Sequence, residues 1–428
     1  MIHPDTVPAL VYCDESGNIR DFADLRMAGM SHGRYVQPRC EDLIELPEGS
    51  DFFSLPQRLP VGIEPGTGEP LLLAEDHFRP GRKIQAVAAF MAPAHTSTYT
   101  AAYQSQQGAD LLPLFAYTAV GWHDGRFWVA GFRSDDDPRQ DHSRFSQQAI
   151  DRRTAKQLHK HPANRLVQHL GICCLSYRCP AARNYFLGRW EAPLPTSPQC
   201  NARCLGCISL QPSGSCPSTQ ERLQFVPTVR EILDIAVPHL NRAERPVVSF
   251  GQGCEGEPLL QGDLLEASVK AIRKQTGRGT INCNTNASLP GVVERLASAG
   301  LDSMRVSLNS ARQAFYEAYY RPRNYCFADV RESILCMKKA GRFVSLNYFV
   351  LPGFTDSHQE TAAFMDLIEQ TEPNFIQLRN LNIDPEWYLA SVDSPPDQPV
   401  HSVRQWLKMI KKAFPSLRFG YYNPCLNP

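Results

Sequence analysis

The spacing of hydrophobic residues is strand-like in the first third of the chain. Two aromatic and β-branched runs, residues 115–122 and 126–132, flank Asp124-Gly125, a pair that favours the tight turn of a β-hairpin. Residues 55–82 are dense in Pro and Gly, which predicts an extended surface loop. We therefore expect residues 1–140 to form a smaller β-rich N-terminal domain.

The pattern becomes helical over residues 141–189. Apolar residues such as Leu166, Leu170 and Cys173 recur at intervals of three and four, with a break near Pro162. This segment is expected to be a helical connector that leads into a second domain.

Short apolar runs alternate with amphipathic stretches from residue 190 onward. The predicted strands are 192–197, 246–250, 279–283, 304–308, 343–350 and 375–379. The predicted helices are 229–237, 264–272, 292–299, 330–339, 361–370 and 403–414. Strict alternation implies parallel strands with helices outside. The fold class expected for residues 190–428 is therefore α/β, a partial (β/α)6 TIM-like barrel with a C-terminal extension, and sites on such sheets lie at the C-terminal ends of the strands.

Composition restricts the class of protein without naming a function. The 428 residues are 43% hydrophobic and 21% charged, an ordinary globular composition long enough for two domains. The 44 basic and 44 acidic residues give no net charge, which argues against nucleic acid as a partner. The sequence shows neither a signal segment nor an apolar run of membrane length, so we expect a cytoplasmic location and no membrane partner.

Three of the 14 cysteines are spaced as C-x3-C-x2-C, at Cys200, Cys204 and Cys207. Such a triplet arises by chance in roughly 0.015 chains of this composition. Clustered thiolates in a reducing compartment indicate a soft metal or an iron–sulfur cluster, and three thiolates without a fourth would leave one iron open. The alternative is a non-catalytic zinc or structural iron–sulfur module, which requires a fourth ligand such as Cys179 or Cys216.

The triplet resembles the signature of the radical S-adenosylmethionine (radical SAM) superfamily. The resemblance implies that the three cysteines are catalytic and bind three irons of a [4Fe-4S] cluster, whose fourth iron chelates S-adenosylmethionine. It further implies reductive cleavage of this cofactor to a 5′-deoxyadenosyl radical, which abstracts hydrogen from a substrate. The family usually has an aromatic residue where this chain has Gly206. The partial barrel is also the fold that the resemblance implies.

Gly256-Glu257-Pro258 resembles the second hallmark of the family. It lies about fifty residues after the triplet, at the end of the second predicted strand. The resemblance implies that these residues bind the cofactor and that the Glu257 carboxylate accepts a hydrogen bond from its ammonium group. Taken alone, the motif is also compatible with a glycine-rich turn that opens a helix.

Four further cofactor-binding residues follow from the resemblance. Asn286 ends the third predicted strand, where family members have residues near the ribose of the cofactor or near the substrate. Ser307 and Asn309 end the fourth, where the resemblance implies hydrogen bonds to the ribose or the carboxylate of the cofactor. Arg321 resembles an arginine that pairs with this carboxylate. Asn is also a common turn residue and Arg a common surface residue, so both alternatives stay open.

Cys173, Cys174 and Cys179 precede the triplet by about twenty to thirty residues. They could help to bind an auxiliary cluster or metal. The favoured interpretation is that Cys173 and Cys174 are small apolar residues on a buried helix face.

The sequence leaves the substrate unidentified. The additional N-terminal domain favours a peptide or protein, and a cofactor precursor is the other main candidate, ahead of an RNA base. The resemblance implies a low-potential electron donor, a flavodoxin or a ferredoxin.

Overall fold

The computed structural model describes residues 7–212, 216–395 and 400–428. The chain folds into two compact units, each held together mainly by contacts among its own residues. Unit 1 is drawn from Met1–Asp136, Phe349–Met365 and Leu378–Pro415, and unit 2 from Asp137–Tyr348, Asp366–Gln377 and Ser416–Pro428. The division predicted from the sequence, 1–140, 141–189 and 190–428, stays a prediction.

Unit 1 begins with a series of antiparallel strands. These are β1 Ala9–Asp14, β2 Ile19–Met27, β3 Gly29–Ser31, β4 Arg34–Val36, β5 Leu43–Glu45, β6 Asp51–Leu55, β7 Arg58–Ile63, β8 Pro70–Leu72, β9 Ile84–Phe90, β10 His95–Ser97, β11 Thr100–Ala101, β12 Tyr103–Ser105, β13 Val120–His123 and β14 Arg126–Arg133. The central sheet has the order β10-β14-β13-β1-β2-β7-β12, and β11-β3-β4 form a second sheet. Hairpin β13–β14 turns at Asp124-Gly125, so the predicted β-rich N-terminal region is confirmed.

The prediction of a surface loop over residues 55–82 was wrong, because β7 and β8 lie within it. Gly62 lies within β7, at a position where a Cβ atom would lie only 2.8 Å from the Cβ atom of Leu25. Glycine in this strand therefore marks close packing, which composition alone does not distinguish from a turn. The first predicted hairpin run was also too long, since β13 begins only at Val120.

Two C-terminal helices, α10 Pro385–Ser391 and α11 Val403–Ala413, also belong to unit 1. The Arg58 guanidinium of β7 and the Asp384 carboxylate that precedes α10 form an ion pair with an N–O distance of 2.9 Å, and the two side chains are only 3% and 2% exposed. The Asp384 carboxylate also caps α10. Segments more than three hundred residues apart therefore share one core.

The connector is helical, as predicted. It comprises α1 Gln147–Lys160, α2 Arg165–Leu175 and α3 Pro180–Leu187. Asn164 starts α2 by accepting a hydrogen bond from the Val167 backbone N–H group, after the break near Pro162. None of the helices in the described part of the chain combines the length and the apolar character that crossing a membrane requires.

Unit 2 is organised on a curled parallel sheet. Its strands pair in chain order and are β15 Arg189–Pro193, β16 Glu244–Phe250, β17 Thr280–Thr285, β18 Ser303–Leu308, β19 Phe343–Val350, β20 Phe375–Asn380 and β21 Arg418–Gly420. The intervening helices are α4 Val229–Arg242, α5 Gly262–Gln275, α6 Pro290–Ala299, α7 Gln313–Tyr320, α8 Phe327–Lys339 and α9 His358–Thr371. All six residues of β17 are buried, which is typical of a strand covered on both faces.

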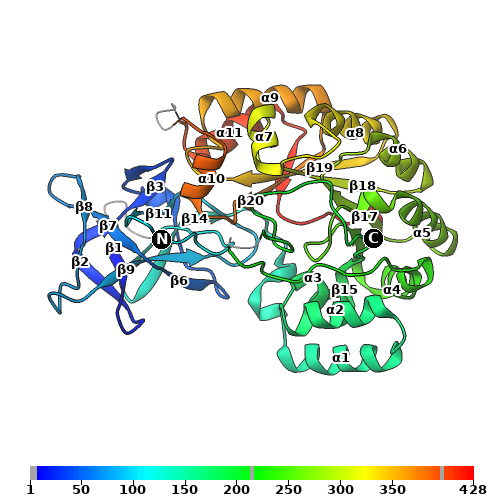
Figure 1. Ribbon diagram of the computed structural model, residues 1–428, viewed down its shortest axis with the longest axis horizontal. Coiled ribbons are helices and arrows are strands. Elements are labelled where there is room, and N and C mark those ends of the chain that lie inside the picture. Colours follow the sequence, from blue (N-terminus) through cyan, green and yellow to red (C-terminus); the bar gives the residue numbers. More distant parts are fainter. Residues whose placement is uncertain (1–6, 213–215, 396–399) are drawn as a thin grey trace. The chain divides into compact units, whose positions relative to one another are not determined.

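The helices α4, α5, α6 and α8 cover the outer face of this sheet (Figure 1). The α/β partial barrel is therefore confirmed, with α7 and the short strand β21 added to the predicted elements. The short 3-10 helices are Cys40–Asp42, Pro138–Gln140, His142–Arg144 and Pro258–Gln261.

Candidate functional site

Two loops at adjacent strand ends of unit 2 are joined by their backbones. The cysteine loop, residues 194–207, follows β15, and the glycine loop, residues 251–257, follows β16. The backbone N–H of Gly256 donates to the Ser197 carbonyl oxygen over 2.7 Å, and that of Glu257 donates to the Gln199 carbonyl oxygen over 2.8 Å. The two motifs recognised in the sequence therefore form one structure.

The cysteine loop is also attached to the C-terminal end of α7. The backbone N–H groups of Arg203 and Leu205 donate to the carbonyl oxygens of Tyr320 and Tyr319 over 2.9 and 3.0 Å. Since the last carbonyls of a helix lack partners within the helix, α7 provides acceptors that fix the loop.

Cys200, Cys204 and Cys207 are half-buried free thiols. Burial, and then the nearby Glu257, raise the pKa of the Cys200 thiol to about 11. The Arg222 guanidinium donates to the Cys207 sulfur over 3.3 Å. Metal binding at these thiols releases protons, because thiolates are the ligands.

The sulfurs of the three motif cysteines are not grouped closely enough to share one metal ion. Among residues 7–212, 216–395 and 400–428, one group of three His, Cys, Asp or Glu side chains places its ligand atoms within 4.8 Å of one another, and it does not contain the motif cysteines. Thiolates on three different irons lie farther apart than thiolates that share one zinc ion.

Glycine is required at two positions of the glycine loop. A Cβ atom at Gly256 would overlap the Gln199 carbonyl oxygen, and one at Gly251 would overlap the Asn284 carbonyl oxygen. Gly251 also has a φ of +76°, which L-residues rarely adopt. The loop therefore packs against backbone on both sides.

The Glu257 carboxylate connects the glycine loop to the end of β17. It accepts hydrogen bonds from the Thr285 hydroxyl at 2.5 Å, the Asn286 backbone N–H at 2.9 Å and the Leu259 backbone N–H at 3.0 Å. Pro258 starts the short 3-10 helix that Glu257 caps. Burial raises the pKa of Glu257 to about 7. Because a carboxylate offers about four acceptor positions, these three donors leave about one position unused.

Asn286 lies between the end of β17 and the cysteine loop. Its side-chain amide donates to the Asn201 side-chain oxygen over 2.8 Å, next to Cys200. Asn201 in turn donates to the Ser288 hydroxyl over 2.9 Å. The structure thus brings Asn286 to the motif cysteines, and its side chain helps to hold their loop.

The remaining predicted cofactor residues lie farther along the sheet. Asn309 is buried at the end of β18 and donates to the Phe315 carbonyl oxygen of α7 over 3.0 Å, and Ser307 is half-buried in β18. Arg321 is exposed and caps α7 with a φ of +46°. It directly follows Tyr320, whose carbonyl oxygen holds the cysteine loop. The cofactor roles of these residues stay predictions.

Glu255 is the main residue of this region that sequence reasoning missed. Its carboxylate accepts from the backbone N–H groups of Thr196 and Ser197 at 2.7 and 2.9 Å, and from those of Gly251 and Gln252 at 2.6 and 3.0 Å. Burial raises the pKa of Glu255 to about 7. The sequence feature that could have identified Glu255 is its position two residues before Glu257, as a second carboxylate in a glycine-rich segment.

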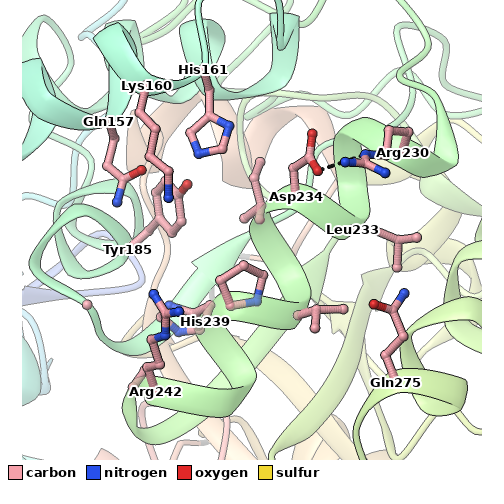
Figure 2. A pocket seen from close by; sticks show the side chains of 15 residues that line it. Gln157, Lys160, His161, Tyr185, Arg230, Leu233, Asp234, His239, Arg242 and Gln275 are labelled. Atoms are coloured by element: carbon pink, nitrogen blue, oxygen red, sulfur yellow. Dashed lines mark hydrogen bonds and ion pairs between the residues drawn. The ribbon is translucent and has the colours of Figure 1, made fainter.

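A separate cavity of about 370 Å³ lies among the helices of unit 2 (Figure 2). Its lining residues come from α1, α3, α4 and α5 and include Lys160, Tyr185, Asp234 and Arg242. None of the predicted cofactor residues lines it.

Comparison with known proteins gives a family match and distant relatives. Residues 194–365 match the model of the Radical SAM superfamily. The GTP 3′,8-cyclase of Lactiplantibacillus plantarum is 26% identical over 195 residues, which cover 45% of this chain and 53% of that protein. The GTP 3′,8-cyclase of Marinobacter nauticus is 25% identical over 189 residues, 43% of this chain and 52% of that protein. The chain thus spans about half the length of the curated relatives it matches.

Among solved structures, a radical SAM methyltransferase from Sphaerobacter thermophilus matches with a TM-score of 0.39 and 17% identity, covering 54% of this chain and 66% of that chain. Methylornithine synthase matches with a TM-score of 0.38 and 12% identity, covering 65% of this chain and 72% of that chain. Members of the matched family are enzymes that bind a [4Fe-4S] cluster and S-adenosylmethionine. The matched residues, 194–365, contain both the cysteine loop and the glycine loop, so this part of the chain is a radical SAM domain.

Proposed function

We propose that this protein is a radical SAM enzyme that reductively cleaves S-adenosylmethionine and uses the resulting 5′-deoxyadenosyl radical to abstract hydrogen from a substrate. The observation that carries the proposal is the backbone pairing between the cysteine loop and the glycine loop, which brings the two family motifs together at adjacent strand ends. A bound [4Fe-4S] cluster would supply the electron for this cleavage.

In this proposal, the chain holds and orients the reacting groups. Cys200, Cys204 and Cys207 are the cluster ligands, and Arg222 provides a positive charge beside the Cys207 sulfur. Glu257 accepts from the ammonium group of S-adenosylmethionine through the acceptor position that its three internal donors leave open.

The proposed substrate is a peptide or protein side chain, or a cofactor precursor. Unit 1 supports this choice, since it has a core of its own and is large enough to recognise a substrate. The GTP 3′,8-cyclases make GTP a reasonable nucleotide to include in a substrate screen. The proposed electron donor is a flavodoxin or a ferredoxin, and the proposed location is the cytoplasm.

The experiment that tests the proposal is anaerobic assay of 5′-deoxyadenosine. The protein is reconstituted with iron and sulfide, reduced with dithionite and mixed with S-adenosylmethionine. We expect about four irons per chain and formation of 5′-deoxyadenosine. The variants Cys200→Ala, Cys204→Ala and Cys207→Ala should each abolish it.

Cys336→Ala, in a half-exposed thiol of α8, is the matched control and should retain the activity. A reconstituted cluster without any 5′-deoxyadenosine would contradict the proposal and favour a structural cluster. Retained cleavage in a motif variant would contradict the ligand assignment.

A further inference from the structure

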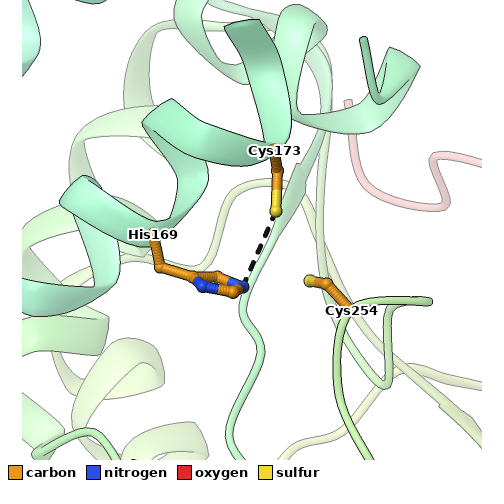
Figure 3. Close-up of side chains that lie close together, drawn as sticks. All are labelled: His169, Cys173 and Cys254. Atoms are coloured by element: carbon orange, nitrogen blue, oxygen red, sulfur yellow. Dashed lines mark hydrogen bonds between the residues drawn. The ribbon is translucent and has the colours of Figure 1, made fainter. Parts of the chain in front are cut away.

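A second group of soft metal ligands lies in unit 2, apart from the motif cysteines. His169 and Cys173 are four residues apart on α2, so both side chains leave the same face of the helix. Cys254 comes from the glycine loop after β16 and is 4% exposed. Figure 3 shows the three side chains converging on one point.

The distances within this group fit a single metal ion. The His169 Nε2 atom and the Cys173 sulfur are 3.6 Å apart, and all three ligand atoms lie within 4.8 Å of one another. A tetrahedral zinc ion, with bonds of about 2.3 Å to sulfur and about 2.0–2.1 Å to nitrogen, separates these two kinds of donor by about 3.6 Å. Two sulfurs and an imidazole nitrogen are a ligand set that zinc favours.

The structure sets Cys174 apart from Cys173 and Cys179, the other two cysteines that the sequence grouped together before the motif. The Cys174 sulfur lies 3.5 Å from the Thr154 hydroxyl of α1, so Cys174 is buried between two helices, as the favoured interpretation predicted. Cys179 lies beside the group, since its backbone N–H donates to the Cys173 carbonyl oxygen over 2.9 Å. Cys173 instead meets a histidine and a loop cysteine that the sequence did not connect with it.

We propose that His169, Cys173 and Cys254 bind one Zn²⁺ ion, which connects α2 to the glycine loop. The ion would hold a loop whose neighbouring residues, Glu255 and Gly256, contact the cysteine loop. Its role is structural: it fixes the position of the glycine loop. Three protein ligands leave a fourth position for water or for Cys179. Zinc fits better than an auxiliary [4Fe-4S] cluster, because cluster thiolates bind different irons and lie farther apart.

The test measures metal content and does not depend on S-adenosylmethionine cleavage. Full-length protein is purified without oxygen and dialysed against a weak chelator, and zinc and iron are quantified by mass spectrometry. A full-length variant with Cys200, Cys204 and Cys207 changed to Ala removes competing thiolates. We expect about one zinc per chain in both proteins, and less than about 0.1 after Cys173→Ser or Cys254→Ser.

Cys174→Ser is the matched control, since Cys174 is adjacent in sequence, equally buried and directed away from the group. It should keep the zinc, and equal zinc loss in this control would overturn the proposal. Circular dichroism checks that each variant is folded. Co²⁺ added to the triple Ala variant gives a second readout, and this variant still contains His169, Cys173 and Cys254. Cobalt bound to thiolates in a tetrahedral site has strong visible absorption bands, which we expect to see. Absence of these bands would overturn the proposal. It would also be overturned if the wild type held more iron than one [4Fe-4S] cluster requires and Cys173→Ser lost that additional iron.

Discussion

At the scale of single residues, buried acceptors determine how the two motif loops meet. Glu255 and Glu257 lie two residues apart, and each accepts several hydrogen bonds from loops that follow different strands. Their side chains point to different neighbours, Glu255 to the start of the cysteine loop and Glu257 to the end of β17. We therefore infer a positioning role for Glu255, while Glu257 is the proposed acceptor for the ammonium group of the cofactor.

We predict that Glu255→Gln weakens both fold and function. The Gln amide would present an NH2 group to backbone donors that now share a carboxylate, and each lost buried acceptor costs about 1–3 kcal/mol. Thermal unfolding should occur at a lower temperature, and S-adenosylmethionine binding, followed by calorimetry, should weaken. Glu221→Gln, in an exposed side chain, should change neither quantity. Unchanged stability in Glu255→Gln would refute the positioning role.

We predict that His239 makes the stability of the folded protein depend on pH. Burial lowers the pKa of this imidazole from 6.5 to about 4, while its Nε2 atom lies 2.7 Å from the Trp190 carbonyl oxygen. The unfolded chain binds a proton at this imidazole more readily than the folded chain does. The free energy of unfolding is therefore highest above pH 6.5 and decreases as the pH falls towards 4. The loss is up to about 3 kcal/mol.

Urea unfolding of the full-length protein at pH 7 and pH 5, followed by circular dichroism, measures this effect. His239→Gln can still donate to Trp190 but does not titrate, so its stability should depend less on pH between these values. His159→Gln, in an exposed residue of α1, should keep the wild-type dependence. Identical pH dependence in wild type and His239→Gln would refute the assignment.

At the scale of elements, the site is built from loops that follow parallel strands. β15, β16 and β17 are neighbours in the sheet, so the loops after them meet at one edge. Glycines permit this approach, because side chains at Gly251 and Gly256 would overlap backbone atoms of adjacent segments.

We predict that Gly256→Ala impairs the site strongly. The new methyl group must displace the Gln199 carbonyl and with it the start of the cysteine loop. Overpacking of this kind costs about 1–3 kcal/mol, which, if it acts on the cofactor-bound state, corresponds to roughly fivefold to 150-fold weaker binding of S-adenosylmethionine. Equilibrium binding to reconstituted protein is the measurement.

Gly277→Ala is the matched control for this variant, because a Cβ atom there would meet open space. Its binding should equal that of the wild type. If Gly256→Ala bound S-adenosylmethionine as tightly as the wild type does, the prediction would be wrong, because close contact between the cysteine loop and the glycine loop would then not be needed for binding.

At the scale of the whole molecule, each unit is assembled from segments that are distant in the sequence. Unit 1 joins N-terminal strands to α10 and α11, and the Arg58–Asp384 ion pair is buried within it. Removal of one partner of a buried pair leaves an uncompensated charge and typically costs about 3–5 kcal/mol.

We predict that Arg58→Met destabilises unit 1 by about 3 kcal/mol. Four of the five tryptophans, at positions 122, 128, 387 and 406, lie in segments of unit 1, so tryptophan fluorescence mainly reports its unfolding in urea. Arg126→Met removes an exposed pair with Glu45 and should change stability by less than about 1 kcal/mol. Equal effects of the two variants would contradict the structural importance of the buried pair.

The sequence by itself determined the fold class and the two motifs of the site. Alternation of apolar runs and amphipathic stretches depends on local periodicity, so the parallel strands and most helices of unit 2 could be predicted within a few residues. The spacing of Cys200, Cys204 and Cys207 and the Gly256-Glu257-Pro258 motif are likewise local features. Both could be found without knowing which segments meet.

Only the tertiary structure decided which distant groups come together. The hydrogen bond from Thr196 to Glu255, the hydrogen bond from Asn286 to Asn201, and the proximity of His169 to Cys254 each join segments separated by more than fifty residues. The residues of β7 looked like a loop because Pro and Gly carry no signal for a strand, yet pairing with neighbouring strands and packing against Leu25 made them one. Such long-range pairing and packing depend on the completed fold, and local sequence patterns do not encode them separately.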